Sequence, residues 1–95
     1  MSKFRVTGYV VTGLIEYQGD LAPRVIVYGI RNDENNAKEL FKNVVEEEKQ
    51  SLKLSGIDFN LQRTNEKEIR IIENKGDCVT TIDLHKVYEE EKEED

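Results

Sequence analysis

The sequence has no tryptophan and only one proline, one cysteine and one histidine among its 95 residues. A lone cysteine, Cys78, excludes an internal disulfide and favours a chain that works in a reducing compartment. A lone histidine, His85, excludes a metal site built from several imidazoles. The scarcity of proline predicts regular elements joined by few rigid turns.

Long hydrophobic runs are also missing. No segment approaches the roughly twenty apolar residues of a transmembrane helix. The first residues lead directly into an alternating pattern rather than into the apolar core of a secretory signal. We therefore expect a cytoplasmic protein with no membrane segment. No glycine pattern resembles a phosphate-binding loop, because Gly8, Gly13 and Gly19 are widely spaced and open no helix.

Negative charge is concentrated at one end of the chain. The formal net charge is −6, and residues 89–95 contain six acids and one lysine. This segment therefore carries −5, which leaves −1 for residues 1–88. A run of like charges has nothing to bury and is typical of a solvated tail. The sequence thus predicts a single domain over residues 1–88 and an acidic, disordered tail over residues 89–95.

The clearest periodic feature is an amphipathic helix between Asn35 and Ser55. Asp33 and Asn36 are both good N-cap residues, and Gly56 suits the position just past the helix end. Apolar residues within the segment recur at helical spacing and form one stripe. The stripe consists of Ala37, Leu40, Phe41, Val44, Val45 and Leu52.

Most of the remaining chain alternates with the period of β-strands. Strands are predicted over residues 3–12, 24–30, 57–62, 68–73 and 78–85. The element order is therefore β-β-α-β-β-β. One amphipathic helix that covers one face of a five-stranded, mainly antiparallel sheet gives a two-layer α+β fold.

No group of residues amounts to an enzyme signature. Cys78 and His85 have opposite parity along their strand, so they cannot form a nucleophile–base pair. Asp58 and Asp83 share the outer parity of two strands and could meet there, but solvated charges explain them better than an acid–base pair. We therefore predict a protein that is not an enzyme, with no catalytic residues, no bound metal and no cofactor.

The first two strands carry apolar residues on both of their faces. If the helix covers Val6, Val10, Val25 and Val27, the opposite face stays uncovered. That face contains Tyr9, Val11, Ile26, Tyr28 and Ile30. A contiguous exposed apolar surface usually marks an interface, so we predict protein binding, first as a homodimer through this face and then with another protein partner. Burial by residues 13–17 is the alternative explanation.

Two nucleic-acid roles are the alternatives to protein binding. Tyr9 and Tyr28 could stack on the bases of a single strand while nearby arginines hold phosphates. The patch is only slightly basic, however, and the acidic tail repels phosphate. The acids could instead mimic nucleic acid and inhibit a DNA-binding protein, although most of them lie where order is least expected. A protein partner is therefore preferred to nucleic acid.

Overall fold

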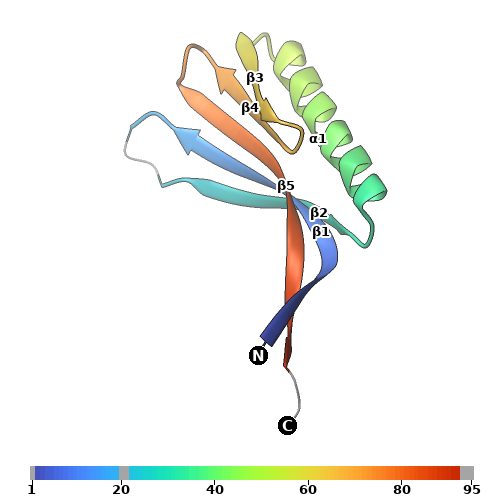
Figure 1. The fold of residues 1–95 in the computed structure, drawn as a ribbon. Helices are drawn as coiled ribbons and strands as arrows, with labels where there is room; N and C mark the ends of the chain where they lie inside the picture. The colour runs from blue at the N-terminus through green and yellow to red at the C-terminus, as the bar shows by residue number, and fades with distance from the viewer. Residues whose placement is uncertain (1, 20–21, 93–95) are drawn as a thin grey trace.

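The computed structural model describes residues 2–19 and 22–92. Its strands form one five-stranded antiparallel sheet in the order β2-β1-β5-β4-β3, and helix α1 lies against one face of this sheet (Figure 1). The elements are β1 Ser2–Tyr17, β2 Arg24–Arg31, α1 Glu34–Leu54, β3 Phe59–Asn65, β4 Glu68–Glu73 and β5 Cys78–Lys92. The predicted fold class, one amphipathic helix on a five-stranded antiparallel sheet, is confirmed.

The helix begins after Asp33, which acts as its N-cap. Asp33 Oδ1 accepts a hydrogen bond from the backbone N of Asn36 at 2.8 Å, and Oδ2 accepts one from the side-chain amide of Asn36 at 2.6 Å. Of the two candidate caps, Asp33 is therefore the cap and Asn36 is its donor. After the helix, Gly56 has a φ of 69°, which glycine adopts at little cost. Each end of α1 lies within one residue of its predicted position.

The hydrophobic core lies between the apolar stripe of α1 and one face of the sheet. The buried helix residues are Ala37, Phe41, Val44, Val45 and Leu52. The buried apolar residues of the sheet are Val11, Ile69, Ile71, Ile82 and Leu84. Because each large apolar side chain that leaves water contributes roughly 1.5–3 kcal/mol, this contact fixes which face of the sheet meets the helix.

The predicted orientation of β1 and β2 is wrong. Val11 was expected to face away from the helix, but it is fully buried in the core, and Tyr9 and Tyr28 pack against the same core. The cause is the length of β1, which continues to Tyr17. From Tyr9 to Tyr17 the residues on the Val11 side are uncharged, whereas the opposite side ends in Glu16. The prediction stopped the strand at residue 12 and so missed this asymmetry.

A β-bulge in β2 changes which of its side chains share a face. Val11 pairs with Gly29 and Thr12 pairs with Val27, so Tyr28 is the extra residue between them. Strict alternation, which the prediction assumed, therefore fails at Tyr28.

The bulge separates two isoleucines that were predicted to lie together. Ile26 pairs with Gly13 on the helix side of the sheet, whereas Ile30 pairs with Val10 on the opposite side. The prediction that Ile26 and Ile30 share one face is therefore wrong.

Strands β1 and β5 continue past the rest of the sheet as a two-stranded ribbon, which we call the arm. It consists of residues 2–8 of β1 paired with residues 87–92 of β5. The arm projects away from the helix-covered sheet (Figure 1), and its outermost pair is Ser2 with Lys92. It lengthens the molecule, whose longest dimension is 59 Å.

The arm corrects the predicted end of the folded domain. Residues 89–92 were expected to belong to a disordered tail, but they form the last part of β5 and pair with residues 2–5 of β1. The prediction is therefore wrong for these four residues. Residues 93–95, which complete the predicted tail, lie outside the described residues.

Candidate interaction surface

The sheet face opposite α1 is open, since no helix or strand covers it within residues 2–19 and 22–92. Its β1–β2 half is apolar. Val25, Val27 and Ile30 are 69%, 59% and 62% exposed, and Val10 and Leu14 lie half-buried beside them. Cross-strand pairing places Leu14 against Val25 and Val10 against Ile30. We call these five residues the apolar patch.

The patch reaches the edge of the sheet, because β2 is an edge strand. Between Arg24 and Arg31 this strand has no charged residue. Natural edge strands are usually protected from pairing by charges, prolines or bulges. The other edge strand, β3, carries Arg63 together with polar neighbours, whereas β2 has its bulge at Tyr28 and otherwise exposes apolar side chains. The two edges of the sheet are therefore chemically unlike.

The β5–β4 half of the open face contains a pair of acids in addition to the half-buried pair of Ile72 and Val79. Glu68 and Asp83 lie directly opposite each other on neighbouring strands. Burial, and then the negative charge of Glu68, raise the pKa of Asp83 above its usual value. His85 Nε2 lies 4.0 Å from Asp83 Oδ2 and 3.0 Å from Thr12 Oγ1. Like charges placed opposite each other destabilise a sheet, so this half is poorly suited to close packing against its own copy.

The suggested meeting of Asp58 with Asp83 does not occur. Asp58 precedes β3, and β4 lies between β3 and β5. The acid that meets Asp83 is Glu68, which sequence reasoning missed. The predicted turn over residues 74–77 contained the signal, because a hairpin that pairs Glu73 with Cys78 also brings residues 68 and 83 together.

A second group of titratable side chains lies on the helix side of the sheet. Burial, and then a hydrogen bond to Glu73, raise the pKa of the Cys78 thiol to about 11. Burial, and then the charge of Glu73, raise the pKa of Glu48. Burial, and then the charge of Glu48, raise the pKa of Tyr28. Every one of these shifts favours the neutral form, and a thiol that stays protonated is a poor nucleophile.

Cys78 and His85 lie on opposite faces of β5, as their parity predicted. Cys78 is opposite Glu73 on the helix side, whereas His85 is opposite Val10 and contacts Thr12 on the open face. In the part of the chain that the structure describes, no three His, Cys, Asp or Glu side chains are grouped closely enough to hold a metal ion. Over the same residues, no helix has the length and apolar character needed to cross a membrane.

The structure separates the five residues that were predicted to form an interface. Tyr9, Val11 and Tyr28 belong to the helix side, and Ile26, which is 38% exposed, has the same orientation. Ile30 alone belongs to the apolar patch. The other patch residues were missed because the wrong parity assigned them to the core. They are Val10, Leu14, Val25 and Val27.

No family model matches the chain, and neither the curated proteins nor the solved structures compared with it give a match. The role of the open face therefore has to be argued from its own geometry and chemistry.

Proposed function

We propose that the chain is a small protein-binding domain that associates with a second copy of itself through the apolar patch. The observation that carries this proposal is the exposure of Val25, Val27 and Ile30 on the sheet face that α1 does not cover. Contiguous apolar surface in contact with water is unfavourable, and it commonly marks an interaction site. Packing two patches against each other removes both from water.

Face-to-face packing suits β2 better than edge-to-edge pairing. Two antiparallel β2 strands in full overlap would place Arg24 of one copy opposite Arg31 of the other. Like charges at opposed positions are destabilising. When the patches pack face to face, both arginines stay at the rim in water and the apolar side chains interdigitate, as they do between the sheets of a β-sandwich. We therefore favour a contact made by side chains rather than by backbone hydrogen bonds.

The two tyrosines on which the nucleic-acid alternative depends do not lie on the open face. Tyr28 packs against Gly13 and the core, and Tyr9 packs against the same core, so neither ring projects from the open face. Near the patch, Arg31 Nη1 donates a hydrogen bond to the carbonyl oxygen of Ile30 at 2.8 Å. Protein binding remains the function that the open face supports best.

Sedimentation velocity over the micromolar range tests the apolar patch. The wild-type chain should gain average mass with concentration, and Val27→Lys should reduce that gain because it places a charge in the contact. Leu54→Lys is the matched control, because Leu54 is 87% exposed at the end of α1, outside the patch. It introduces the same charge and should leave association unchanged.

Salt provides a second readout. A contact made by apolar side chains should persist between about 50 mM and 1 M salt, because screening weakens exposed charge interactions and not apolar burial. A wild-type chain that stays monomeric at high micromolar concentration would contradict the proposal. So would a Val27→Lys variant that associates as strongly as the wild type.

A further inference from the structure

We propose that the arm carries a second self-association site, at which β5 of one copy pairs edge to edge and antiparallel with β5 of another copy. This site lies on a different part of the molecule from the apolar patch. It also rests on a different observation, the order of the residues along the unpaired edge of β5. The proposal therefore stands or fails independently of the patch.

The edge of β5 that faces β4 is free along the arm. Pairing of β4 with β5 ends at Asp83, and the next backbone contact on that side is Leu84 N donating to Lys67 O at 2.8 Å. From His85 to Lys92, no strand among the described residues pairs with this edge, whereas β1 pairs with the other edge up to Lys92. A two-stranded ribbon is marginally stable in water, and its free edge is a template for another strand.

The free edge is complementary to itself in one register. Residues that lie opposite each other in an antiparallel pair share a face. A two-fold axis at Tyr88 therefore places Lys86 of each copy opposite Glu90 of the other, and the two Tyr88 rings side by side. Lys86, Tyr88 and Glu90 are all exposed. The register thus forms two unlike-charge pairs and one aromatic pair, each of a kind that stabilises sheets.

Neighbouring registers are less favourable. An axis at Glu89 places two Glu89 carboxylates opposite each other, and an axis at Val87 leaves Lys86 opposite Tyr88. On the remaining face of the arm, Glu89 Oε2 is already 3.4 Å from Arg5 Nη2 of the same copy. Arg5 and Glu89 are therefore paired within one chain, whereas Lys86 and Glu90 form no ion pair among residues 2–19 and 22–92.

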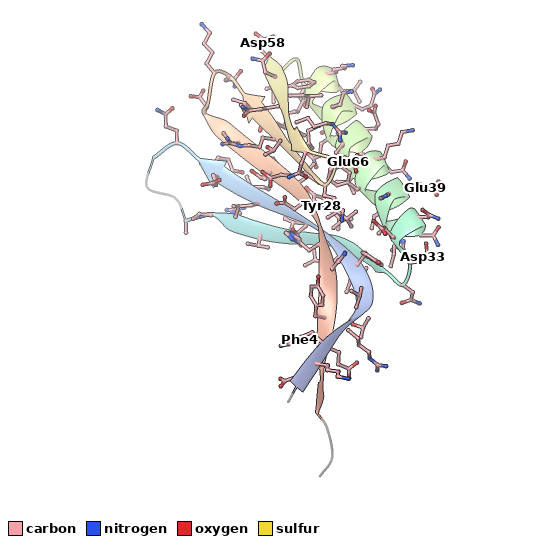
Figure 2. All side chains as sticks on the ribbon, viewed as in Figure 1. Phe4, Tyr28, Asp33, Glu39, Asp58 and Glu66 are labelled. Carbon is pink, nitrogen blue, oxygen red and sulfur yellow. The ribbon has the colours of Figure 1, made fainter. Side chains whose placement is uncertain are left out.

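Apolar side chains of the arm support the same pairing. Tyr88 is 56% exposed and pairs with Val6, and Phe4, which is 67% exposed, lies next to Val6 on the same side of the ribbon. Figure 2 shows Phe4 on the arm, away from α1. Joining two arms gives a four-stranded sheet in the order β1-β5-β5-β1, on which these side chains form one larger surface instead of two small ones.

Disulfide trapping tests the register. Directly opposed residues of an antiparallel pair have Cα atoms about 4.5–5.5 Å apart, within the range that a disulfide spans. In a Cys78→Ser background, Tyr88→Cys should form a covalent dimer under mild oxidation. Val6→Cys is the matched control on the same face, because two β1 strands would lie three strand spacings apart, about 14 Å. It should remain monomeric.

The outcomes of trapping separate the possible contacts. A covalent dimer of the Tyr88→Cys variant alone supports edge pairing. Equal cross-linking of the Val6→Cys variant shows that arms stack face to face and overturns the proposal, and so does the absence of cross-linking in both variants. Cross-linking of a Val87→Cys variant in preference to Tyr88→Cys overturns the register.

Charge exchange tests the same pairing without cysteines. It is measured by sedimentation in a Val27→Lys background, which removes the patch contact. Lys86→Glu or Glu90→Lys alone should weaken dimerisation at least tenfold at low salt, because each opposes like charges twice. The double exchange should restore the affinity to within threefold of the background. Lys53→Glu, an equal charge change on exposed α1, should have no effect.

The same series distinguishes the failure of this proposal from the failure of the patch. If Val27→Lys abolishes all association, the arm site is wrong and the patch stands. If Val27→Lys changes nothing while Lys86→Glu abolishes association, the patch is wrong and the arm site stands. If both sites exist, each molecule has two different two-fold contacts, so the chains should assemble into open linear arrays.

Discussion

The ring of Tyr28 lies over Gly13, so close that a Cβ atom on Gly13 would be 2.7 Å from Tyr28 Cε2 and 2.9 Å from Tyr28 Oη. The bulge in β2 directs this ring to the helix side, and the missing side chain at Gly13 gives it room. Within the described residues the buried Oη has no hydrogen-bond partner. The ring is therefore held in place by packing, and a single methyl group added at Gly13 should destabilise the fold.

We expect Gly13→Ala to lower the free energy of unfolding by about 1–3 kcal/mol, the usual cost of overpacking. Urea denaturation measures it. Gly29→Ala is the matched comparison, because its Cβ would lie 2.8 Å from Cδ2 of Leu40, the far end of a flexible side chain. Leu40 can move more easily than an aromatic ring, so this loss should be smaller. Equal losses, or a Gly13→Ala protein as stable as the wild type, would show that the ring is not confined.

Because the carboxylates of Glu68 and Asp83 repel each other, we expect that removal of one of the two charges stabilises the protein. Glu68→Gln should raise the free energy of unfolding at pH 7 by about 0.2–1 kcal/mol, the scale of a cross-strand charge effect. Exposed Glu66, two residues earlier, provides the control variant Glu66→Gln, which should change stability less.

The pH dependence of that difference gives a second check. The pKa of Asp83 is raised in the folded protein, so over the interval above its unfolded pKa the folded state binds more protons than the unfolded state. The contribution of Asp83 to the free energy of unfolding therefore increases as the pH falls through its raised pKa. The advantage of Glu68→Gln should shrink over the same interval as Asp83 becomes neutral. An advantage that stays constant down to pH 3 would mean that the two carboxyl groups do not interact.

The Cys78 thiol should react slowly and should make the fold sensitive to alkali. Its pKa is raised from 9.0 to about 11 by burial and by Glu73. Between these values the unfolded chain loses the thiol proton while the folded chain keeps it, so stability should fall as the pH rises from about 9 to about 11. Cys78→Ser should remove this part of the loss.

Alkylation by iodoacetamide at pH 8.5 measures the thiol directly, because the thiolate is the reactive form. The native protein should react much more slowly than the urea-unfolded chain. Glu73→Gln should speed the native reaction by removing the carboxylate that disfavours the thiolate. If native and unfolded chains react at one rate, the thiol is not protected.

Loss of the helix cap should be costly for an exposed residue. Asp33→Ala should lower the free energy of unfolding by about 1 kcal/mol, because it removes the acceptor for the backbone N of Asn36. Asn35→Ala, in the exposed first turn, should be neutral or slightly stabilising, since alanine is the better helix former. Thermal denaturation followed by circular dichroism compares the two variants. A larger loss for Asn35→Ala than for Asp33→Ala would place the cap elsewhere.

The helix could be predicted well from sequence because its signals are local. The stripe from Ala37 to Leu52, the cap at Asp33 and the glycine at position 56 all lie within one segment. The core face of β1 and β2 could not be assigned correctly, because both parities are apolar and the choice depends on the full length of β1 and on the bulge at Tyr28. The candidate site inherited that error, and of the five residues predicted for it only Ile30 lies on the open face.

The arm shows a different limit of sequence reasoning. Residues 89–92 contain three glutamates and one lysine, a composition that favours solvated chain. They form a strand because residues 2–5 supply hydrogen-bonding partners. Such a partner lies too far away in the sequence for any local pattern to indicate it.

The pairing of the first strand with the last also determines when the sheet can form. Arg5 and Glu89 are 84 residues apart, yet they pair across the arm, and β1 and β5, the strands that carry them, are neighbours in the interior of the sheet. Closing so long a loop costs chain entropy before any contact repays it, so folding should be slow for a domain of this size. During synthesis β1 and β2 are made long before β5. Val11 and its neighbours therefore stay exposed to water until β5 pairs with β1. The topology thus places the greatest risk of misassembly on the unfinished chain.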